Sequence, residues 1–366
     1  MLKRHLTTVN ARDQVAVIKA MKLVISGEIT LAVTPGRIGP KSELVLQAMD
    51  TESEIDAQIG LLVATSGSTS NPKAVLLSLD AIKASIAAVA DELEIPGTWH
   101  LVLPLEHVAG QMTALRGLSA QSNLEAPTIN AGDPMQLATY AKTIRNNAGP
   151  NYITLVPEHL NRLALINELE SLKYFDRVII GAGRVSEPTE TLIKNLGLRV
   201  TRSYGLTETC GGIVWDGKPL SNVAISLSDI GEVLVSSAMN AFGYRSSPDL
   251  NLDTIHTGDL GRFQNGRLQI LGRMDRKIKH KGLFVDLDEL ASFIQQEFSI
   301  ENAVLSEDER IWVFCQSSEI SELESKLIVT FGKHLLGLEI RFMDQLPRTE
   351  LGKVDNWELK TDWIKK

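Results

Sequence analysis

Cysteine is scarce in this sequence. Only Cys210 and Cys315 occur among 366 residues, which is too few for a framework of disulfide bonds. The amino terminus has no apolar core of the kind that a signal peptide carries, and no stretch approaches the roughly 20 apolar residues that cross a bilayer. We therefore expect a cytoplasmic protein without a membrane partner.

Positive charge is also in deficit. The chain has 37 Lys and Arg against 45 Asp and Glu, a net charge of -8. Neutralising a nucleic-acid backbone requires a basic face, so we expect no nucleic-acid partner. Apolar residues are plentiful at 43%, and 366 residues exceed what one core comfortably holds, so two domains are expected.

Strand-like and helix-like segments alternate from about residue 15 to residue 200, the pattern of a layered α/β domain. Residues 81–93 are typical of its helices, because apolar residues recur at helical spacing and Ser78 or Asp80 can cap the start. After Thr209 short β-like stretches are broken by Gly and Asp, which predicts a β-rich subdomain.

A smaller α+β unit is predicted from Arg276 onward. Its expected elements are β structure at 278–285, a helix at 288–298, a strand at 311–315 and a helix at 322–331. We place the boundary near Asp275, which gives domains of residues 1–274 and 275–366.

A hydroxyl-rich stretch, Thr-Ser-Gly-Ser-Thr-Ser-Asn-Pro-Lys, runs from Thr65 to Lys73 after an apolar run. Gly with Ser and Thr lets backbone amides and hydroxyl groups converge on phosphate oxygens, and Lys73 adds a mobile charge. A Walker P-loop is excluded, because Lys73 follows Pro72 and precedes Ala74 instead of Ser or Thr. Taken alone, the stretch also fits a polar surface turn.

Residues 203–209, Ser-Tyr-Gly-Leu-Thr-Glu-Thr, combine an aromatic ring, a glycine, hydroxyl groups and one carboxylate. Glu208 could hold Mg²⁺, which takes oxygen ligands and usually shares them with substrate phosphates. The alternative is a capped turn.

Three further clusters have ordinary explanations when each stands alone. Asp259 in Thr-Gly-Asp-Leu-Gly could accept both hydroxyls of a ribose or belong to a β-turn. The basic run at residues 272–282 could be a solvated surface or a nucleic-acid patch. Residues 346–355, Leu-Pro-Arg-Thr-Glu-Leu-Gly-Lys-Val-Asp, form a loop around Lys353.

In this order and spacing, the five clusters resemble the adenylate-forming superfamily of acyl-CoA synthetases, firefly luciferases and nonribosomal adenylation domains. The resemblance implies a large amino-terminal domain and a small, mobile carboxyl-terminal domain that rotates about a hinge. It also implies two half-reactions with ATP, Mg²⁺ and coenzyme A. ATP and a carboxylate first give an acyl-adenylate and pyrophosphate, and a thiol then displaces AMP.

The same resemblance implies roles for individual residues. Lys353 would be the catalytic lysine at the carboxylate and the α-phosphate, Asp275 the hinge, and Glu208 the metal ligand. The nucleotide would be held by Thr65, Ser66, Gly67, Ser68, Thr69 and Lys73 at its β- and γ-phosphates, Gly181, Ala182 and Gly183 at adenine, and Asp259 with Arg273 at the ribose. Thr207 would bind phosphate next to the metal ligand Glu208, and Tyr204 and Gly205 would also contact the nucleotide.

The chain departs from the family pattern at some positions. Ser70 stands where the phosphate loop usually has Gly, and Arg276 where a second Asp is frequent. Only 64 residues precede Thr65, fewer than in most relatives, so we expect a pared-down amino-terminal subdomain.

The acyl substrate is suggested by residues 101–118 and 210–220, which resemble o-succinylbenzoate-CoA ligases of menaquinone biosynthesis. Their substrate has two carboxylates, so one needs a cationic cradle, for which Arg116 or Arg202 is expected, with Ser203 beside it and Arg184 as a weaker candidate. His107 would gate the pocket or orient the acyl group, unless it is a hydrogen-bonded structural histidine. Cys210 is expected to be a packing residue.

Other functions stay open at this point. One is a ligase for another aryl or acyl acid, or an adenylation enzyme that loads a carrier protein. Another is a nucleotide-binding regulator without catalysis, which would have no need of Lys353 or Glu208. The oligomeric state is open as well, a homodimer included.

Overall fold

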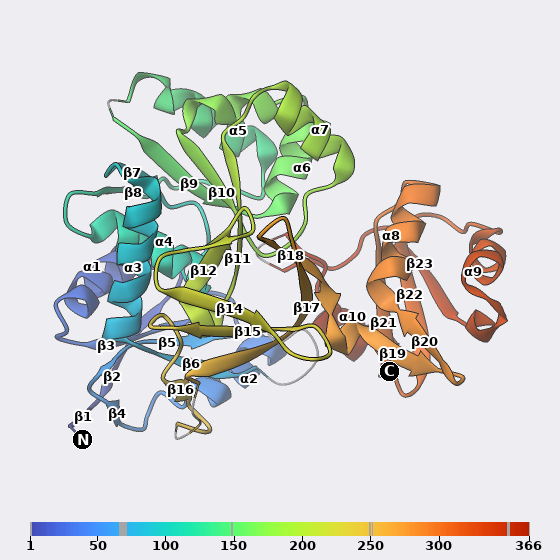
Figure 1. The fold of residues 1–366 in the computed structure, drawn as a ribbon, viewed down its shortest axis with the longest axis horizontal. Helices are drawn as coiled ribbons and strands as arrows, with labels where there is room; N and C mark the ends of the chain where they lie inside the picture. Colours follow the sequence, from blue (N-terminus) through green and yellow to red (C-terminus); the bar gives the residue numbers. More distant parts are fainter. Residues whose placement is uncertain are drawn as a thin grey trace. The chain divides into compact units, whose positions relative to one another are not determined.

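A computed structural model, drawn as a ribbon in Figure 1, shows the fold of the chain. The structure describes residues 2–65, 72–147, 149–248, 250, 252–349 and 352–365. Its contacts divide the chain into two compact units. The larger unit comprises Met1–Leu227, Leu234–Thr257 and Phe263–Gln269, and the smaller comprises Ser228–Val233, Gly258–Arg262 and Ile270–Lys366.

A five-stranded sheet lies in the larger unit. In spatial order its strands are β16 (Gly243–Tyr244), β6 (Ala74–Ser78), β5 (Ile59–Ala64), β3 (Thr30–Thr34) and β2 (Leu6–Asn10). β2, β3 and β5 are parallel, whereas β6 runs antiparallel to both β5 and β16. Leu61 of β5 enters a core with α1 (Gln14–Ile25), and Leu62 packs with Met49 of α2 (Pro40–Met49) on the other face. This alternation follows from the two-residue period of a strand.

Helix α3 (Leu79–Leu93) begins directly after β6. The Ser78 hydroxyl oxygen accepts a hydrogen bond from the Ala81 N at 3.1 Å and so caps the first turn. The predicted helix is confirmed, with Ser78 and not Asp80 as its cap. The two-residue β1 (Lys3–Arg4) and β4 (Ile55–Asp56) form a separate ribbon.

A seven-stranded sheet forms the second layer of the larger unit. In spatial order it contains β13 (Lys218–Pro219), β12 (Gly211–Trp215), β11 (Val200–Leu206), β10 (Arg177–Ile180), β9 (Asn151–Leu155), β7 (Thr98–His100) and β8 (Asn123–Glu125). Strands β8, β7, β9, β10 and β11 are parallel to one another, whereas β12 pairs antiparallel with both β11 and β13. The parallel strands therefore end at one common edge.

Helices and short helical turns connect these strands (Figure 1). They are α4 (Val108–Leu118), α5 (Pro134–Thr143), η1 (Ile144–Asn146), α6 (Pro157–Leu165), η2 (Leu169–Tyr174), α7 (Glu187–Asn195) and η3 (Thr207–Thr209). Side chains of α5, α6 and η2 pack on β9 and β10 to form a second core that includes Leu155, Leu160 and Phe175.

The predicted β-rich region after Thr209 is confirmed. It includes a four-stranded sheet in the order β14 (Val223–Leu227), β15 (Glu232–Ser237), β17 (Thr254–Gln264) and β18 (Arg267–Arg273).

The smaller unit contains two further β structures. Strands β19 (Lys277–His280) and β20 (Leu283–Asp286) form a hairpin whose turn residues, Lys281 and Gly282, both have positive φ, as a tight type I′ turn requires. Strands β21 (Asn302–Glu307), β22 (Arg310–Gln316) and β23 (Glu339–Met343) form a mixed sheet. Its helical segments are η4 (Met274–Arg276), α8 (Leu287–Phe298), α9 (Leu323–Phe331), η5 (Lys333–Leu335), α10 (Asn356–Leu359) and η6 (Lys360–Ile364).

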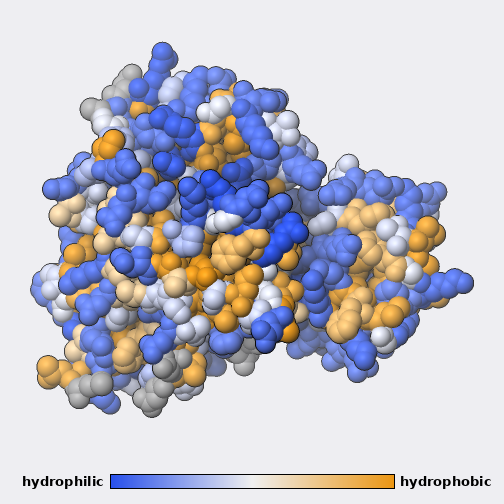
Figure 2. Space-filling view, viewed as in Figure 1, coloured by the Kyte–Doolittle hydropathy of each residue, from blue (hydrophilic) through white to orange (hydrophobic). Residues whose placement is uncertain are grey.

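The expected mixed α/β architecture is therefore confirmed, and the expected elements after Arg276 are present. The division at Asp275 and the mobility of the carboxyl-terminal domain stay predictions. No described helix is long and apolar enough to cross a membrane. Figure 2 shows hydrophobic patches on a largely hydrophilic face of each unit.

Candidate active site

The loop between β5 and β6 is closed at its base by Thr65 and Lys73. The Thr65 N donates a hydrogen bond to the Lys73 carbonyl oxygen at 2.7 Å, and the Lys73 N lies 3.3 Å from the Thr65 hydroxyl oxygen. The structure thus brings the two ends of the predicted phosphate loop together. The predicted phosphate ligands between them lie outside the described residues: Ser66, Gly67, Ser68 and Thr69.

Tyr244 connects Lys73 to Glu208, and it is absent from the sequence prediction. Strand β16 pairs with β6, so that Tyr244 lies opposite Val75. The Lys73 Nζ atom is 5.1 Å from the centre of the Tyr244 ring, and the Tyr244 hydroxyl donates to Glu208 Oε1 at 3.0 Å. Burial and then the nearby carboxylate raise the pKa of Tyr244, so the hydroxyl keeps its proton. A Gly-Tyr pair after Ala241-Phe242 was the only signal in the sequence, and it indicates no more than a short strand.

Glu208 fits the predicted role of a magnesium ligand. Its Oε1 accepts the Tyr244 hydrogen bond, and no described residue donates one to its Oε2. Magnesium is commonly bound by one or two carboxylates together with substrate phosphates and water. No group of three or more His, Cys, Asp or Glu that could hold a metal occurs in the described part of the chain.

The predicted adenine turn and residues 203–207 lie at one edge of the seven-stranded sheet. β10 and β11 are parallel neighbours, with Ile180 opposite Arg202. Residues 181–183 follow β10 directly, and residues 203–206 form the end of β11. Ligands in α/β sheets bind outside the carboxyl ends of parallel strands, so this edge is the expected place for a nucleotide.

Gly205 is required by the packing of the protein itself. A Cβ atom at this position would lie 1.9 Å from the carbonyl oxygen of Gly211 on β12. No residue with a side chain fits there unless the two strands move apart. Its predicted contact with the nucleotide stays a prediction.

His107 lies just before α4, at the end of the helix opposite Arg116. Its Nε2 is 3.8 Å from one oxygen of Glu106, and the other oxygen of Glu106 accepts a hydrogen bond from the Gly36 N at 3.0 Å. Helix α4 lies close to the preceding segment, because a Cβ at Gly110 would be 2.2 Å from the Pro104 carbonyl oxygen. The half-buried His107 is therefore held beside a carboxylate.

Arg116 is a buried cation without a described carboxylate partner. The residue is 7% exposed. Its Nη2 donates to the Ser85 hydroxyl at 3.3 Å, its Cζ is 5.6 Å from the Trp99 ring centre, and its buried Nε has no hydrogen-bond partner. Burial lowers the pKa of Arg116 to about 10, so the guanidinium stays charged at neutral pH. An unpaired buried charge is costly, and an anionic ligand would offset that cost.

Arg202, the other predicted anchor, is already neutralised. Its Nε donates to a Glu190 oxygen at 3.0 Å, its Nη2 contacts the same carboxylate, and its Nη1 is 3.9 Å from Asp216. The Arg202 side chain is also 48% exposed. The structure thus separates two arginines that the sequence left equivalent.

Cys210 is fully buried in the core formed by α1, α3, α4 and the five-stranded sheet. Burial raises the pKa of its thiol to about 12, which leaves almost no nucleophilic thiolate at neutral pH. The geometry therefore agrees with a packing role.

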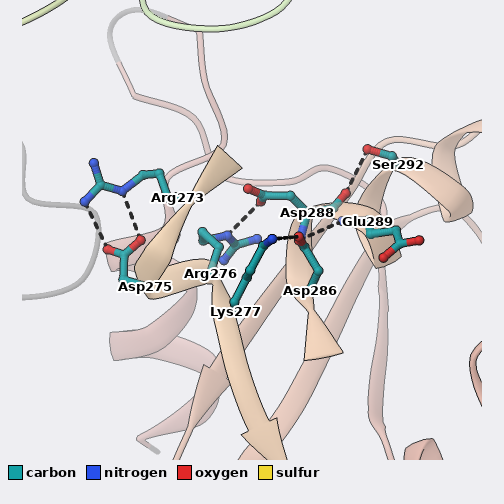
Figure 3. A network of polar contacts seen from close by, with 8 residues as sticks. All are labelled: Arg273, Asp275, Arg276, Lys277, Asp286, Asp288, Glu289 and Ser292. Carbon is teal, nitrogen blue, oxygen red and sulfur yellow. Dashed lines mark hydrogen bonds and ion pairs between the residues drawn. The ribbon is translucent and has the colours of Figure 1, made fainter. Parts of the chain in front are cut away.

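Arg273 bridges two predicted site residues within the smaller unit. Its Nη1 lies 3.2 Å from Asp259 Oδ1, and its Nε donates to Asp275 Oδ1 at 2.9 Å. Figure 3 shows the Arg273 and Asp275 contact. Two residues of the adjacent basic run have acidic partners: Arg276 donates to Asp288 at 2.7 Å, and Lys277 lies 3.8 Å from Asp286 (Figure 3).

Lys353 lies on a short, internally bonded loop. The Thr349 N donates to the Lys353 carbonyl oxygen at 2.8 Å, and Arg348 donates to the Gly352 carbonyl oxygen at 2.8 Å while it also contacts Glu301. Lys353 is exposed as a residue, yet nearby protein atoms desolvate its amine and lower its pKa. The loop therefore presents an ammonium group with no described acidic partner.

Comparisons with known proteins agree with these motifs. A family model described as AMP-binding enzyme matches residues 7–239. The probable 2-succinylbenzoate–CoA ligase of Mycobacterium tuberculosis (strain H37Rv) is 31% identical over 335 residues, which are 86% of this chain and 87% of that protein. The 2-succinylbenzoate–CoA ligase of Lactococcus lactis is 25% identical over 391 residues, covering 98% and 84%.

The fold is similar to that of solved enzymes. The structure of o-succinylbenzoate coenzyme A synthetase from Bacillus subtilis, in complex with ATP and magnesium ion, has a TM-score of 0.78 at 19% identity and covers 97% of this chain and 89% of its own. The chain therefore belongs to the AMP-binding, adenylate-forming enzymes, the superfamily that includes the AMP-forming acid–thiol ligases. The resemblance inferred from the five motifs is confirmed.

Proposed function

We propose that the chain is an ATP-dependent acid–thiol ligase that joins 2-succinylbenzoate to coenzyme A, a reaction of menaquinone biosynthesis. Two findings support the substrate: the named relatives, and the buried, uncompensated charge of Arg116. The latter carries the proposal, because a substrate with two carboxylates needs a cation for the one that does not react. Charge-assisted hydrogen bonds from a guanidinium suit a carboxylate.

In the first half-reaction, an oxygen of the reacting carboxylate attacks the α-phosphorus of ATP. The bond from this phosphorus to the oxygen that bridges to the β-phosphate breaks, and pyrophosphate leaves. Lys353 would hold the carboxylate and the α-phosphate together as charge builds in the transition state. Thr65 and Lys73 would hold the leaving phosphates with residues 66–69, and Asp259 and Arg273 the ribose.

Glu208, with Thr207 beside it, would hold Mg²⁺ through the carboxylate oxygen that Tyr244 leaves unoccupied. When bound, this ion would neutralise charge on the phosphates. Residues 181–183 and 204–205 would lie against adenine, where glycine lets backbone approach the base.

In the second half-reaction, the thiol sulfur of coenzyme A attacks the acyl carbon and AMP leaves. Lys353 has no task at this step. We propose that residues 275–366 then rotate about Asp275, relative to residues 1–274, and remove it from the reacting atoms. His107 would orient the acyl group, and Ser203 would contact the substrate as well.

Release of AMP by the purified protein tests this proposal. With ATP, Mg²⁺ and coenzyme A, we expect AMP and a thioester from 2-succinylbenzoate, and little of either from benzoate or fatty acids. Absence of coenzyme A-dependent AMP release with 2-succinylbenzoate would refute the assignment. Pyrophosphate release with another acid in the panel, or transfer to a carrier protein, would identify a different ligase of the same family.

A further inference from the structure

Tyr244 lies where two predicted parts of the nucleotide site meet. Its hydroxyl donates to Glu208 Oε1 at 3.0 Å, and Lys73 Nζ lies 5.1 Å from the centre of its ring. One side chain thus contacts both the predicted metal ligand and the predicted phosphate ligand. Neither partner is close to it in the sequence.

The backbone around Tyr244 is held on both sides. The Phe242 N donates to the Leu76 carbonyl oxygen at 2.8 Å, and the Arg245 N donates to the Ala74 carbonyl oxygen at 2.8 Å, so residues 242–245 continue the ladder of β6. Upstream, the Ala241 N donates to the Glu208 carbonyl oxygen at 2.7 Å. Tyr244 and Glu208 are therefore coupled through main-chain hydrogen bonds as well as through their side chains.

The orientation of Glu208 matters for a shared metal site. A carboxylate can rotate and offer either oxygen, but a hydrogen bond to Oε1 fixes its plane and leaves Oε2 for another ligand. The Tyr244 ring limits the space of the flexible Lys73 side chain at the same time, through its attraction for the ammonium group. The Glu208 carboxylate and the Lys73 ammonium group are thus held in a fixed relation to each other. This suits a ligand that presents a metal ion and phosphate oxygens together.

We propose that Tyr244 is a positioning residue for magnesium–ATP: its hydroxyl orients Glu208 toward the metal, and its ring orients Lys73 toward the β- and γ-phosphates. The inference rests on the proposed function, since it requires adenylate formation from ATP. A purely structural tyrosine would change stability when altered but not the dependence of the reaction on magnesium.

Tyr244→Phe removes the hydroxyl and keeps the ring. In an exchange assay of labelled pyrophosphate into ATP, we expect its half-saturating Mg²⁺ concentration to rise about tenfold, because Glu208 loses the hydrogen bond that fixes its orientation, with only a modest fall in the melting temperature. Tyr244→Leu also removes the ring, so we expect its KM for ATP to rise further while its affinity for AMP stays close to that of the parent.

Tyr140→Phe is a matched control. The Tyr140 hydroxyl lies 3.3 Å from Glu125 Oε2 and 2.6 Å from His100 Nδ1, so this variant also removes a contact between a half-buried tyrosine and a carboxylate, together with one to a histidine. The residues that the Tyr140 hydroxyl contacts, Glu125 and His100, are not predicted site residues, so we expect the magnesium dependence of this variant to equal that of the parent. Equal shifts in both Phe variants would overturn the inference.

Calorimetric titration of the parent with magnesium–ATP, without any acid, separates the possible failures. No binding by the parent would overturn the proposed function itself. Binding by the parent, together with the same magnesium dependence in Tyr244→Phe, would overturn only the positioning role of Tyr244. Should Tyr244→Leu fail to fold, the near-isosteric Phe variant alone decides.

Discussion

Replacement of Arg116 by methionine should separate recognition of the second carboxylate from folding. In the free protein the guanidinium is buried, and none of the described residues gives it a carboxylate partner, so its removal deletes an uncompensated charge and a methionine stem can fill much of the same space. We expect the free energy of unfolding to stay constant or to rise by about 1–3 kcal/mol. Denaturant titration measures this change.

Activity should move in the opposite direction. Truncating one partner of a buried charge pair costs about 2–5 kcal/mol, so a central value of about 3 kcal/mol predicts a loss of about 150-fold in kcat/KM for 2-succinylbenzoate. A mono-carboxylate analogue of the substrate keeps the reacting carboxylate, and so can still form an adenylate, but lacks the second carboxylate that Arg116 would bind. For this analogue the parent and Arg116→Met should differ little, so a cycle of two proteins and two substrates should give a coupling energy of about 3 kcal/mol.

Arg202→Met is the matched control for this cycle. Because Arg202 is half exposed and already paired with Glu190, we expect a change in kcat/KM of less than about threefold and no change in selectivity. The reasoning fails if Arg116→Met slows both substrates equally. It also fails if the selectivity is lost in Arg202→Met instead.

Three further results follow from the structure. Burial lowers the pKa of His159 from 6.5 to about 4, so the unfolded chain binds the proton first as pH falls. The free energy of unfolding should therefore drop by about 3 kcal/mol between pH 7 and pH 4. If His159→Gln and the parent lose stability equally over this pH range, the reasoning is contradicted. Lys353→Ala should slow exchange of pyrophosphate into ATP at least about 100-fold, yet convert a preformed acyl-adenylate to thioester at nearly the parent rate; equal exchange rates would remove Lys353 from the mechanism. In Gly205→Ala the new Cβ would lie 1.9 Å from the Gly211 carbonyl oxygen, so a denaturant titration should show a loss of about 3 kcal/mol or more in the free energy of unfolding. Gly39→Ala is the control, because a Cβ there meets open space, and it should lose less than about 1 kcal/mol.

Local sequence patterns predicted much of the fold because they depend on near neighbours. The cap at Ser78 needs only the next three residues, and the helix that follows needs only the spacing of apolar residues along residues 81–93. The antiparallel turn from β5 into β6 was harder, because the simple alternation of strands and helices indicates parallel crossovers. Pairing direction depends on what each strand meets in the folded chain.

At the candidate site, too, the sequence predicted local features but not those that depend on contacts in the folded chain. Its motifs were recognisable because each packs several functional residue types into a short stretch, as at residues 203–209. Tyr244 was missed because its importance arises from a two-residue strand that pairs with β6. The choice between Arg116 and Arg202 was likewise undecided, since only burial and the position of Glu190 distinguish them.

The burial of both cysteines has a chemical consequence for an enzyme of this kind. An acyl-adenylate is a mixed anhydride that would acylate an accessible thiolate of the enzyme as readily as that of its cosubstrate. Cys210 lies two residues from Glu208, yet burial raises the pKa of both Cys210 and Cys315 to about 12, so almost no thiolate is present at neutral pH. Neither cysteine therefore offers an accessible thiolate to an acyl-adenylate, which leaves the thiol that enters from solution as the sulfur nucleophile.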